Sequence, residues 1–378
     1  MRDYARLAGK VVWKRTPEQF IFFVTSKCPQ NCKICFYKKG AHLQEPELTI
    51  DEIQKISSGM PPIYWLQISG GEPFLRDDLD QICGIFVRNN RTRLINIPTN
   101  ASQGERVLEI SKRALTANPR AFFNIGISLL GPRDIHDTIT GTHGSFDKAI
   151  ACYQALRELK GFYPNLGLNF TVTQSIDNEA VLKELFDLLM REYQPDHIAF
   201  NFARGLDLAH KYSGSSPQLY LENWNHLFSR VLQRERYYYD LPLKSLLYAV
   251  NMLQKEITYQ VASRDRFVIP CYAARISTVL DETGNLYACE MRKQRLGNFR
   301  ESNYSFRAIW HGPHAENERR SILRNRCFCT HECFITTNIL FNVRMYTALL
   351  CAWLRYGLKL CWAIPAPSSP EEAPCDAK

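Results

Sequence analysis

The stretch FIFFVTSKCPQNCKICFY, residues 20–37, begins as an apolar strand and continues as a loop with three cysteines. The aromatic and β-branched run at 20–26 favours a buried strand. Cys28, Cys32 and Cys35 follow with C-x3-C-x2-C spacing. Three thiolates this close suit a soft metal centre, because zinc and iron-sulfur clusters both bind sulfur. A closed zinc site needs four ligands, so three cysteines indicate a four-iron cluster with one iron left free.

The composition indicates the cellular compartment of the protein and therefore the redox state of these cysteines. The chain has 378 residues, of which 45% are hydrophobic and 22% charged, and it contains 13 cysteines. We find no secretory signal and no apolar stretch of the roughly 20 residues that span a bilayer. We therefore expect a cytoplasmic protein, in which clustered cysteines serve metal or redox chemistry rather than disulfides.

The net charge of +9 is the one compositional hint of an anionic partner. Residues 291–326 hold nine Lys and Arg against three Glu. Because we find no nucleic-acid motif, we interpret this segment as a solvated basic face and expect no nucleic-acid binding.

Strand-like and helix-like segments alternate from residue 18 to about residue 215. The strand candidates are FIFFVTS (20–26), PIYWLQIS (62–69), TRLINI (92–97), FFNIGISL (122–129), LGLNFTVT (166–173) and HIAFNF (197–202). Six βα units in tandem predict an α/β fold with a parallel sheet, right-handed crossovers and outer helices. Since a full barrel needs eight units, we expect an open, partial (β/α)6 TIM-like barrel. Because residues 1–17 are too short for one, we expect no peptide-binding domain before the barrel.

Three further segments follow the predicted barrel. Residues 216–262 indicate a helical linker of two helices broken near Leu241 and Pro242. Residues 263–340 have short strands, turns and cysteines, which predict a small α+β extension. In residues 341–378, the apolar part at 341–364 predicts an amphipathic helix. We expect it to dock on the protein, with contact to a membrane surface as the alternative, and we expect a disordered tail from Ala363.

The second predicted strand ends in SGGEP, residues 69–73, and so opens on the same rim as the cysteine loop. Gly70 and Gly71 allow close backbone approach, and Glu72 can accept hydrogen bonds from an ammonium group. Alone, GGEP is equally a turn sequence. Beside the cysteine loop, it indicates a ligand site.

Together these motifs resemble the radical S-adenosylmethionine (radical SAM) enzymes. The resemblance rests on the cysteine loop, on GGEP, on PTN at 98–100 and on ISLLGPRDIHD at 127–137. It implies a four-iron cluster on Cys28, Cys32 and Cys35 whose free iron binds S-adenosylmethionine. The residues that would contact this cofactor are Phe36, Gly70, Gly71, Glu72, Pro73, Thr99, Asn100 and Ser128.

The resemblance implies an oxidoreductase-type activity. S-adenosylmethionine would be cleaved reductively to a 5'-deoxyadenosyl radical, with electrons from a donor such as flavodoxin or ferredoxin. That radical would abstract hydrogen from a peptide, leading to oxidation or crosslinking; a sugar or other small metabolite is the alternative substrate. The sequence departs from the family at Leu130 and Thr140, where an acid and an arginine are usual. Arg133 or Arg204 would replace that arginine.

A second cysteine set lies beyond the barrel. Cys271 and Cys289 have C-x12-G-x4-C spacing, and Cys327, Cys329 and Cys333 follow. This spacing resembles the SPASM and Twitch extensions of radical SAM enzymes, which implies one auxiliary four-iron cluster. Five cysteines are candidates for the four ligand positions of this cluster. We prefer Cys271, Cys289, Cys333 and one of Cys327 and Cys329. A structural zinc site is the alternative, and with it a non-catalytic, zinc-holding binding protein.

Glu290 follows Cys289 directly. In some related enzymes, an acid at this position is placed to remove a proton as the auxiliary cluster oxidises the substrate radical. We predict this role for Glu290, and a surface carboxylate without a function is the alternative.

Overall fold

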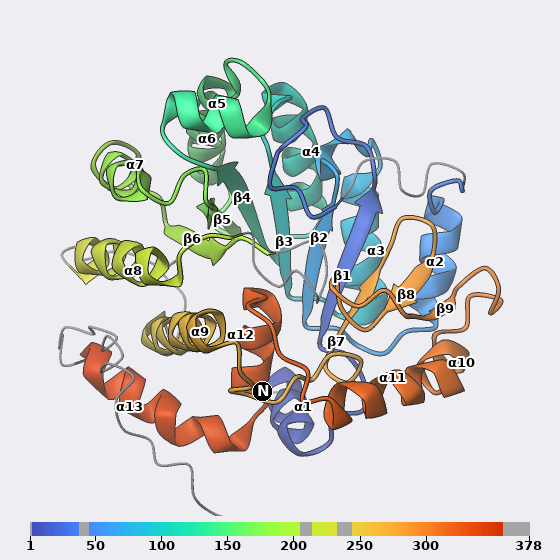
Figure 1. Cartoon of the computed structure of the whole chain (residues 1–378). Helices are drawn as coiled ribbons and strands as arrows, with labels where there is room; N and C mark the ends of the chain where they lie inside the picture. The colour runs from blue at the N-terminus through green and yellow to red at the C-terminus, as the bar shows by residue number, and fades with distance from the viewer. Residues whose placement is uncertain (1, 38–44, 205–213, 233–243, 358–378) are drawn as a thin grey trace, which may run out of the picture.

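The computed structural model describes residues 2–37, 45–204, 214–232 and 244–357 (Figure 1). One open nine-stranded sheet runs through the molecule in the order β6-β5-β4-β3-β2-β1-β7-β8-β9. Strands β1 to β6 are parallel to one another, as the predicted barrel requires. The sheet does not close on itself, because β6 and β9 are its two edges. The α/β fold class and the open, partial barrel are therefore confirmed.

The six barrel strands form where the sequence predicts them. Their bounds are β1 Gln19–Thr25, β2 Trp65–Gly70, β3 Leu94–Thr99, β4 Phe122–Leu129, β5 Leu166–Gln174 and β6 His197–Phe202. Every residue of β1 is buried, because β1 has a strand on each side and helices on its outer face. Its unbroken apolar sequence is what a parallel strand in this position needs.

Helices cover the outer face of the parallel strands (Figure 1). Their bounds are α2 Ile50–Ser58, α3 Leu79–Asn90, α4 Gly104–Ala117, α5 Arg133–Thr140, α6 Ser145–Lys160 and α7 Leu182–Leu188, which continues as a π-helix over Leu189–Tyr193. Thr49 caps α2: its Oγ1 atom accepts from Glu52 N, and the carboxylate of Glu52 accepts from Thr49 N, which completes a capping box.

The C-terminal extension continues the sheet of the barrel. Strand β7 (Ser277–Leu280) pairs in parallel with β1, and β8 (Asn285–Tyr287) and β9 (Arg295–Asn298) add antiparallel strands. Gly284 makes the tight turn between β7 and β8 with a φ of 94°, which favours glycine. Short helices α10 (Phe306–Trp310) and α11 (Pro313–Arg324) follow.

Two helices lie across the inner side of the open barrel (Figure 1). They are α9 (Lys244–Arg264) and α12 (Glu332–Leu340). Gln254 of α9 donates to the carbonyl of Glu332 at 2.9 Å and to Thr336 Oγ1 at 2.6 Å, so the two helices are joined where they face the strands. Helices α1 (Arg2–Val12) and α8 (Pro217–Leu232) complete the element order; the predicted break near Leu241 and Pro242 lies outside the described residues.

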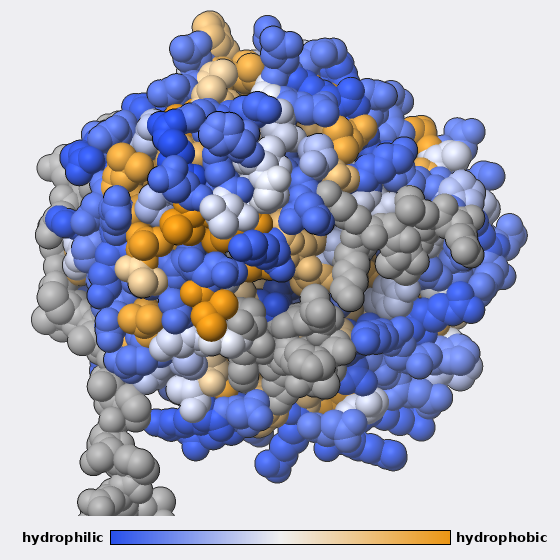
Figure 2. Space-filling view, turned by 45° about the horizontal axis from the view of Figure 1, so that its top comes forward, coloured by the Kyte–Doolittle hydropathy of each residue, from blue (hydrophilic) through white to orange (hydrophobic). Residues whose placement is uncertain are grey.

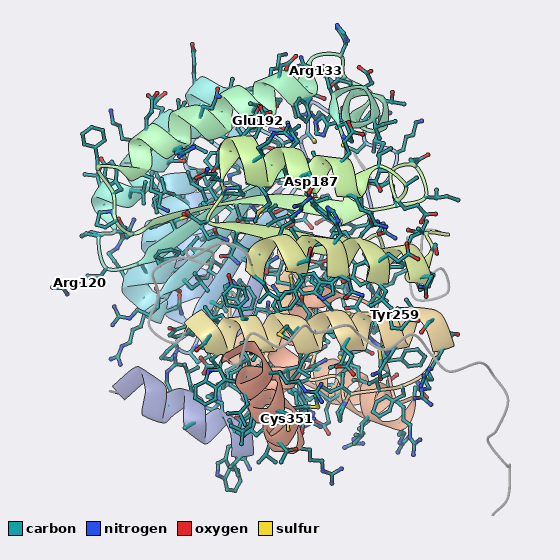
Figure 3. All side chains as sticks on the ribbon, turned by 90° about the vertical axis from the view of Figure 1, so that its left-hand side faces the viewer. Arg120, Arg133, Asp187, Glu192, Tyr259 and Cys351 are labelled. Carbon is teal, nitrogen blue, oxygen red and sulfur yellow. The ribbon has the colours of Figure 1, made fainter. Side chains whose placement is uncertain are left out.

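Helix α13 (Tyr346–Gly357) docks on α9, as expected for the apolar C-terminal segment. Leu349 and Ala352 are buried against α9. Figure 3 shows Cys351 on α13 and Tyr259 on the neighbouring α9. No helix in the described part of the chain is long and apolar enough to span a membrane. The predicted disordered tail from Ala363 lies outside the described residues.

Candidate functional site

The first cysteine loop leaves the carboxyl end of β1 and rests on the end of α5. The backbone N–H groups of Asn31 and Lys33 donate to the carbonyls of Thr140 and Ile139 at 3.2 and 2.9 Å. Cys28 and Cys32 are half-buried and Cys35 is exposed. Three thiols on one anchored, accessible loop fit a cluster that must also admit a ligand. Figure 2 turns the carboxyl end of the barrel toward the viewer and shows polar and apolar residues side by side there.

The two glycines of the next strand end pack against this loop. A Cβ atom on Gly70 would lie 2.3 Å from the carbonyl oxygen of Thr25, and one on Gly71 would lie 2.1 Å from that of Lys27. The backbone N–H groups of Gly71 and Glu72 donate to these same carbonyls at 2.7 Å. The glycines are therefore needed for contact between the β1 and β2 loops, whatever else they contact.

Glu72 is buried and ties the β2 and β3 loops together. Its carboxylate accepts hydrogen bonds from Thr99 Oγ1 at 2.8 Å, Asn100 N at 2.7 Å and Phe74 N at 3.2 Å. Burial raises the pKa of Glu72 to about 7, although these three bonds oppose the shift. With its carboxylate engaged by internal donors, Glu72 offers a ligand its backbone rather than its side chain.

The remaining rim residues lie close to the cysteine loop. Asn100 Nδ2 is 3.5 Å from Cys28 Sγ, and Pro73 begins the short helix η1 (Pro73–Leu75) beside Glu72. Ser128 is half-buried near the end of β4. The structure thus brings the predicted cofactor residues of β1, β2 and β3 to one edge of the sheet.

The positions that depart from the family pattern have structural roles. Leu130 is buried, and its N–H donates to His136 Nδ1 at 3.0 Å. Thr140 is buried with its hydroxyl 2.8 Å from Ser145 Oγ, while its carbonyl holds the cysteine loop. Arg133 forms an exposed ion pair with Asp147 and lies at the outer edge of the molecule (Figure 3). Of the two candidate replacements for the arginine, Arg204 is the one near the cysteine loop.

Arg204 lies between the first cysteine loop and the C-terminal cysteines and contacts residues beside both. Its guanidinium lies over the ring of Phe36, 4.2 Å from the ring centroid, and forms an ion pair with Glu290. Phe36 follows Cys35, and Glu290 follows Cys289. One arginine therefore contacts a neighbour of each cysteine group.

Glu290 is held as an anion. Its side chain is 3% exposed, and His331 Nε2 lies 2.8 Å from its Oε2. Burial would raise the pKa of Glu290, but the charges and hydrogen bonds of Arg204 and His331 outweigh burial and lower the pKa to about 2. Glu290 is thus a buried, paired carboxylate, and the alternative of a surface residue does not hold.

Four of the five C-terminal cysteines form one group: Cys271, Cys289, Cys327 and Cys329. The Cys271 thiol donates to Cys327, and this bond is the main reason that the pKa of Cys327 falls to about 6. Cys289 and Cys329 are close enough to act electrostatically on this pair. The sequence did not choose between Cys327 and Cys329, and the structure places both in the group.

Cys333, on the first turn of α12, has other main partners than these four thiols: it hydrogen-bonds with His331 and acts electrostatically on Arg204 and Lys255. Gln67 Nε2 of β2 is 3.2 Å from its Sγ atom. The thiol lines a cavity of about 320 Å³ between the strands and helices α9 and α12. The structure therefore places Cys333 in the interior of the barrel, which sequence spacing could not reveal.

No three His, Cys, Asp or Glu side chains of the described residues lie close enough to share a single metal ion. A four-iron cluster binds each thiolate to a different iron, so its ligands lie further apart than those of one zinc ion. The four grouped thiols are the candidate ligands of a second centre.

Fold and site together define a partial barrel with a cysteine loop at its carboxyl rim. The family model that matches residues 22–189 is that of the Radical SAM superfamily. That match covers a little under half of the chain and includes the cysteine loop and strands β2 to β5.

Two curated relatives match a little under half of this chain. The pre-heme d1 synthase of Dinoroseobacter shibae is 32% identical over 186 residues, and the Fe-coproporphyrin III synthase of Methanosarcina barkeri is 29% identical over 180 residues. Each match covers 46% of this chain and 41% of the relative. The chain thus spans about two fifths of the length of these relatives.

Solved structures share the fold over most of the chain. Streptococcus suis SuiB bound to the precursor peptide SuiA has a TM-score of 0.56 and covers 84% of this chain and 70% of its own. AnSMEcpe with bound AdoMet and the Kp18Cys peptide has a TM-score of 0.57 and covers 91% and 99%. Both are 14% identical to this chain, so the likeness concerns the fold.

Proposed function

We propose that this chain abstracts hydrogen from a small polar substrate that binds inside the barrel. Cys28, Cys32 and Cys35 would hold a four-iron cluster, which would supply the electron for reductive cleavage of S-adenosylmethionine. The observation that carries the substrate location is the cavity of about 320 Å³ between the strands, α9 and α12. Pro98 and Gly126 line it, one residue before Thr99 and two before Ser128.

The residues of the rim would orient the cofactor over this cavity. The backbone of Gly70 to Pro73 would receive its amino group, while Phe36, Thr99, Asn100 and Ser128 would contact the rest. Glu72 would act by holding the β2 and β3 loops together, since its carboxylate already accepts three hydrogen bonds. Arg204 would fix the ring of Phe36 from the other side.

The second cluster would bind Cys271, Cys289, Cys327 and Cys329, in a SPASM/Twitch-like extension. There it would supply one-electron oxidation of the substrate radical. Cys333 would contact the substrate instead, because it lines the cavity and lies outside the group of four. Glu290, beside Cys289, is an anion paired with Arg204 and His331, so it would accept a proton only as the substrate radical is oxidised, when that proton becomes strongly acidic.

A peptide substrate is the second candidate. SuiB and anSMEcpe have been crystallised with peptides, and they share this fold. A peptide would have to enter a cavity that α9 and α12 close on the inner side, where Gln254 joins the two helices. The cavity therefore favours a compact molecule.

The test is an anaerobic preparation reduced with dithionite and incubated with S-adenosylmethionine. We expect about eight irons with matching sulfide, and 5'-deoxyadenosine as product. Cys351→Ala, on the exposed face of α13, is the control that should change neither. Zinc without sulfide, or no cleavage by fully loaded protein, would overturn the proposal.

The ligand set has its own test. We expect Cys329→Ala to lose about four irons and Cys333→Ala to keep about eight. If Cys333→Ala loses about four irons and Cys329→Ala keeps about eight, the ligands are instead Cys271, Cys289, Cys327 and Cys333, a set that the sequence analysis allows. Electron paramagnetic resonance of both variants would show which cluster signal is lost.

A further inference from the structure

The inward-facing residues of β2, β3 and β4 form layers with different chemistry. In the layer nearest the amino ends, Trp65, Leu94 and Phe122 are paired in register. Two residues further on, Gln67 pairs with Asn96 and Asn96 with Asn124. Side chains of a strand alternate between its two faces, so each set of three lies on one level of the barrel.

Above the amide layer the side chains become small. Pro98 of β3 pairs with Gly126 of β4 on the next inward level. This level lies directly below the rim that bears Thr99 and Ser128. The lining of the cavity is therefore apolar toward the amino ends of these strands, carries amides at the next level and is small below the rim.

Several amide atoms in this cavity lack a partner. Asn169 is 3% exposed, and its Oδ1 atom is buried without a hydrogen bond, as are Gln67 Oε1 and Asn96 Oδ1. Trp65 Nε1 is a buried donor without an acceptor. Buried polar groups are normally satisfied, because each unmade bond is costly. Four unsatisfied atoms around one cavity indicate an occupant that both donates and accepts hydrogen bonds.

The charges at the cavity are already engaged by the protein. Lys255 is the one Lys or Arg among the described residues that line it, and its ammonium group donates to the carbonyl of Phe200. Glu332 Oε1 accepts from Phe202 N at 2.6 Å. A carboxylate or phosphate would find no free cation here.

We propose that this cavity binds a neutral polyhydroxylated ring of about monosaccharide size, such as a hexose or a cyclitol. A hydroxyl group donates and accepts, which matches carboxamides that do the same. The carbon-bound hydrogens of such a ring would face the indole of Trp65 and the ring of Phe122. This inference rests on the proposed function, for which it names the substrate class.

The direct test measures binding to anaerobic, cluster-loaded protein by calorimetry. Glucose, N-acetylglucosamine and myo-inositol form the neutral panel; glucuronate, glucose 6-phosphate and triglycine are the comparators, each up to about 10 mM. We expect a neutral compound to bind, and Asn96→Leu and Gln67→Leu each to weaken it at least about tenfold. Asn89→Leu, an exposed asparagine on α3, should bind as wild type does.

The outcomes separate the two proposals. Binding of no neutral compound, tighter binding of a comparator, or unchanged binding in both variants would overturn this inference. If S-adenosylmethionine is still cleaved in such a case, the proposed radical chemistry stands and only the substrate class fails. Melting temperatures of the variants show whether lost binding reflects lost folding, and 5'-deoxyadenosine formation that rises with the bound compound would support both proposals.

Discussion

The two cysteine groups differ in how much of them the protein covers. At the rim, three thiols lie on a loop, and Cys35 is exposed. In the C-terminal extension, four thiols gather together and Cys289 is buried. A centre that must admit a cofactor needs an open side and a missing ligand, whereas a centre that only transfers electrons can be enclosed. If the proposed function holds, the number of ligands and their accessibility, more than their spacing in the sequence, separate the two roles.

The same two regions hold carboxylates that are equally buried and titrate differently. Glu72 at the rim and Glu290 in the extension are each 3% exposed. Glu72 is surrounded by neutral donors, so burial dominates and its pKa is about 7. Glu290 faces Arg204 and His331, and its pKa is about 2. Neutral hydrogen bonds to Glu72 thus join the loops at the rim. The contact between the barrel and the extension, which we call the junction, depends on the ion pair of Arg204 and Glu290.

The largest contrast should come from removing one cysteine of each group. We expect Cys32→Ala to reduce cleavage of S-adenosylmethionine to background, because the cofactor has no iron to bind. Cys289→Ala should still cleave it but should form little product. Liquid chromatography of 5'-deoxyadenosine and product measures both. Equal loss of cleavage in the two variants would remove the distinction between the groups.

Breaking the charge pair at the junction should have the next largest effect. Glu290→Gln leaves Arg204 buried without its anion, which should cost about 3–5 kcal/mol of the free energy of unfolding. The exposed pair of Arg133 and Asp147 is the matched control, and Asp147→Asn should cost less than about 1 kcal/mol. Urea denaturation of loaded protein measures both. A small effect at Glu290 would mean that solvent reaches the pair.

The fold was largely predictable, since each barrel strand is an apolar run bounded by turn residues. The carboxyl-rim location of GGEP and the cysteine loop followed from the same alternation. The sequence could not show that β7 would pair with β1 and extend the barrel sheet, because pairing between distant segments leaves no local pattern. The sequence likewise could not show which of Cys329 and Cys333 belongs to the group of four thiols. The two residues lie on either side of the turn that starts α12, and their thiols have different neighbours.

The residues that close the site were harder to foresee. Lys255 and Gln254 lie in a helix whose sequence has no motif, and they matter only because α9 crosses the open barrel. A usable signal was present in the strands: Gln67, Asn96, Asn124, Asn169 and Asn201 are polar residues within apolar runs. Amides in a buried strand face must find partners or a ligand, and this pattern could have indicated the cavity.

The titration of Glu72 should make the rim sensitive to pH. Its pKa is raised in the folded protein, so the folded state binds the proton more tightly than the unfolded state does. Stability from this group is therefore full below about pH 4.5 and is lost as the pH rises through 7, by about 1.4 kcal/mol between pH 6 and 8. Urea denaturation at these pH values should show the loss in wild type and in Glu109→Gln, but not in Glu72→Gln. An unchanged slope in Glu72→Gln would assign the titration to another group.

The smallest effect concerns the contact between α2 and the extension, where Arg300 makes two bonds to Glu52 of 2.7 and 3.0 Å. The hydrogen bond from Arg300 is the main reason that the pKa of Glu52 falls to about 2. A lowered pKa stabilises the fold above the unfolded value near 4.5, and the gain is lost as the pH falls through 2. Because water screens this pair, Glu52→Gln should cost about 1 kcal/mol at pH 7 and almost nothing near pH 2. A cost that persists at pH 2 would mean that the capping box with Thr49, rather than the charge, joins the extension to the barrel.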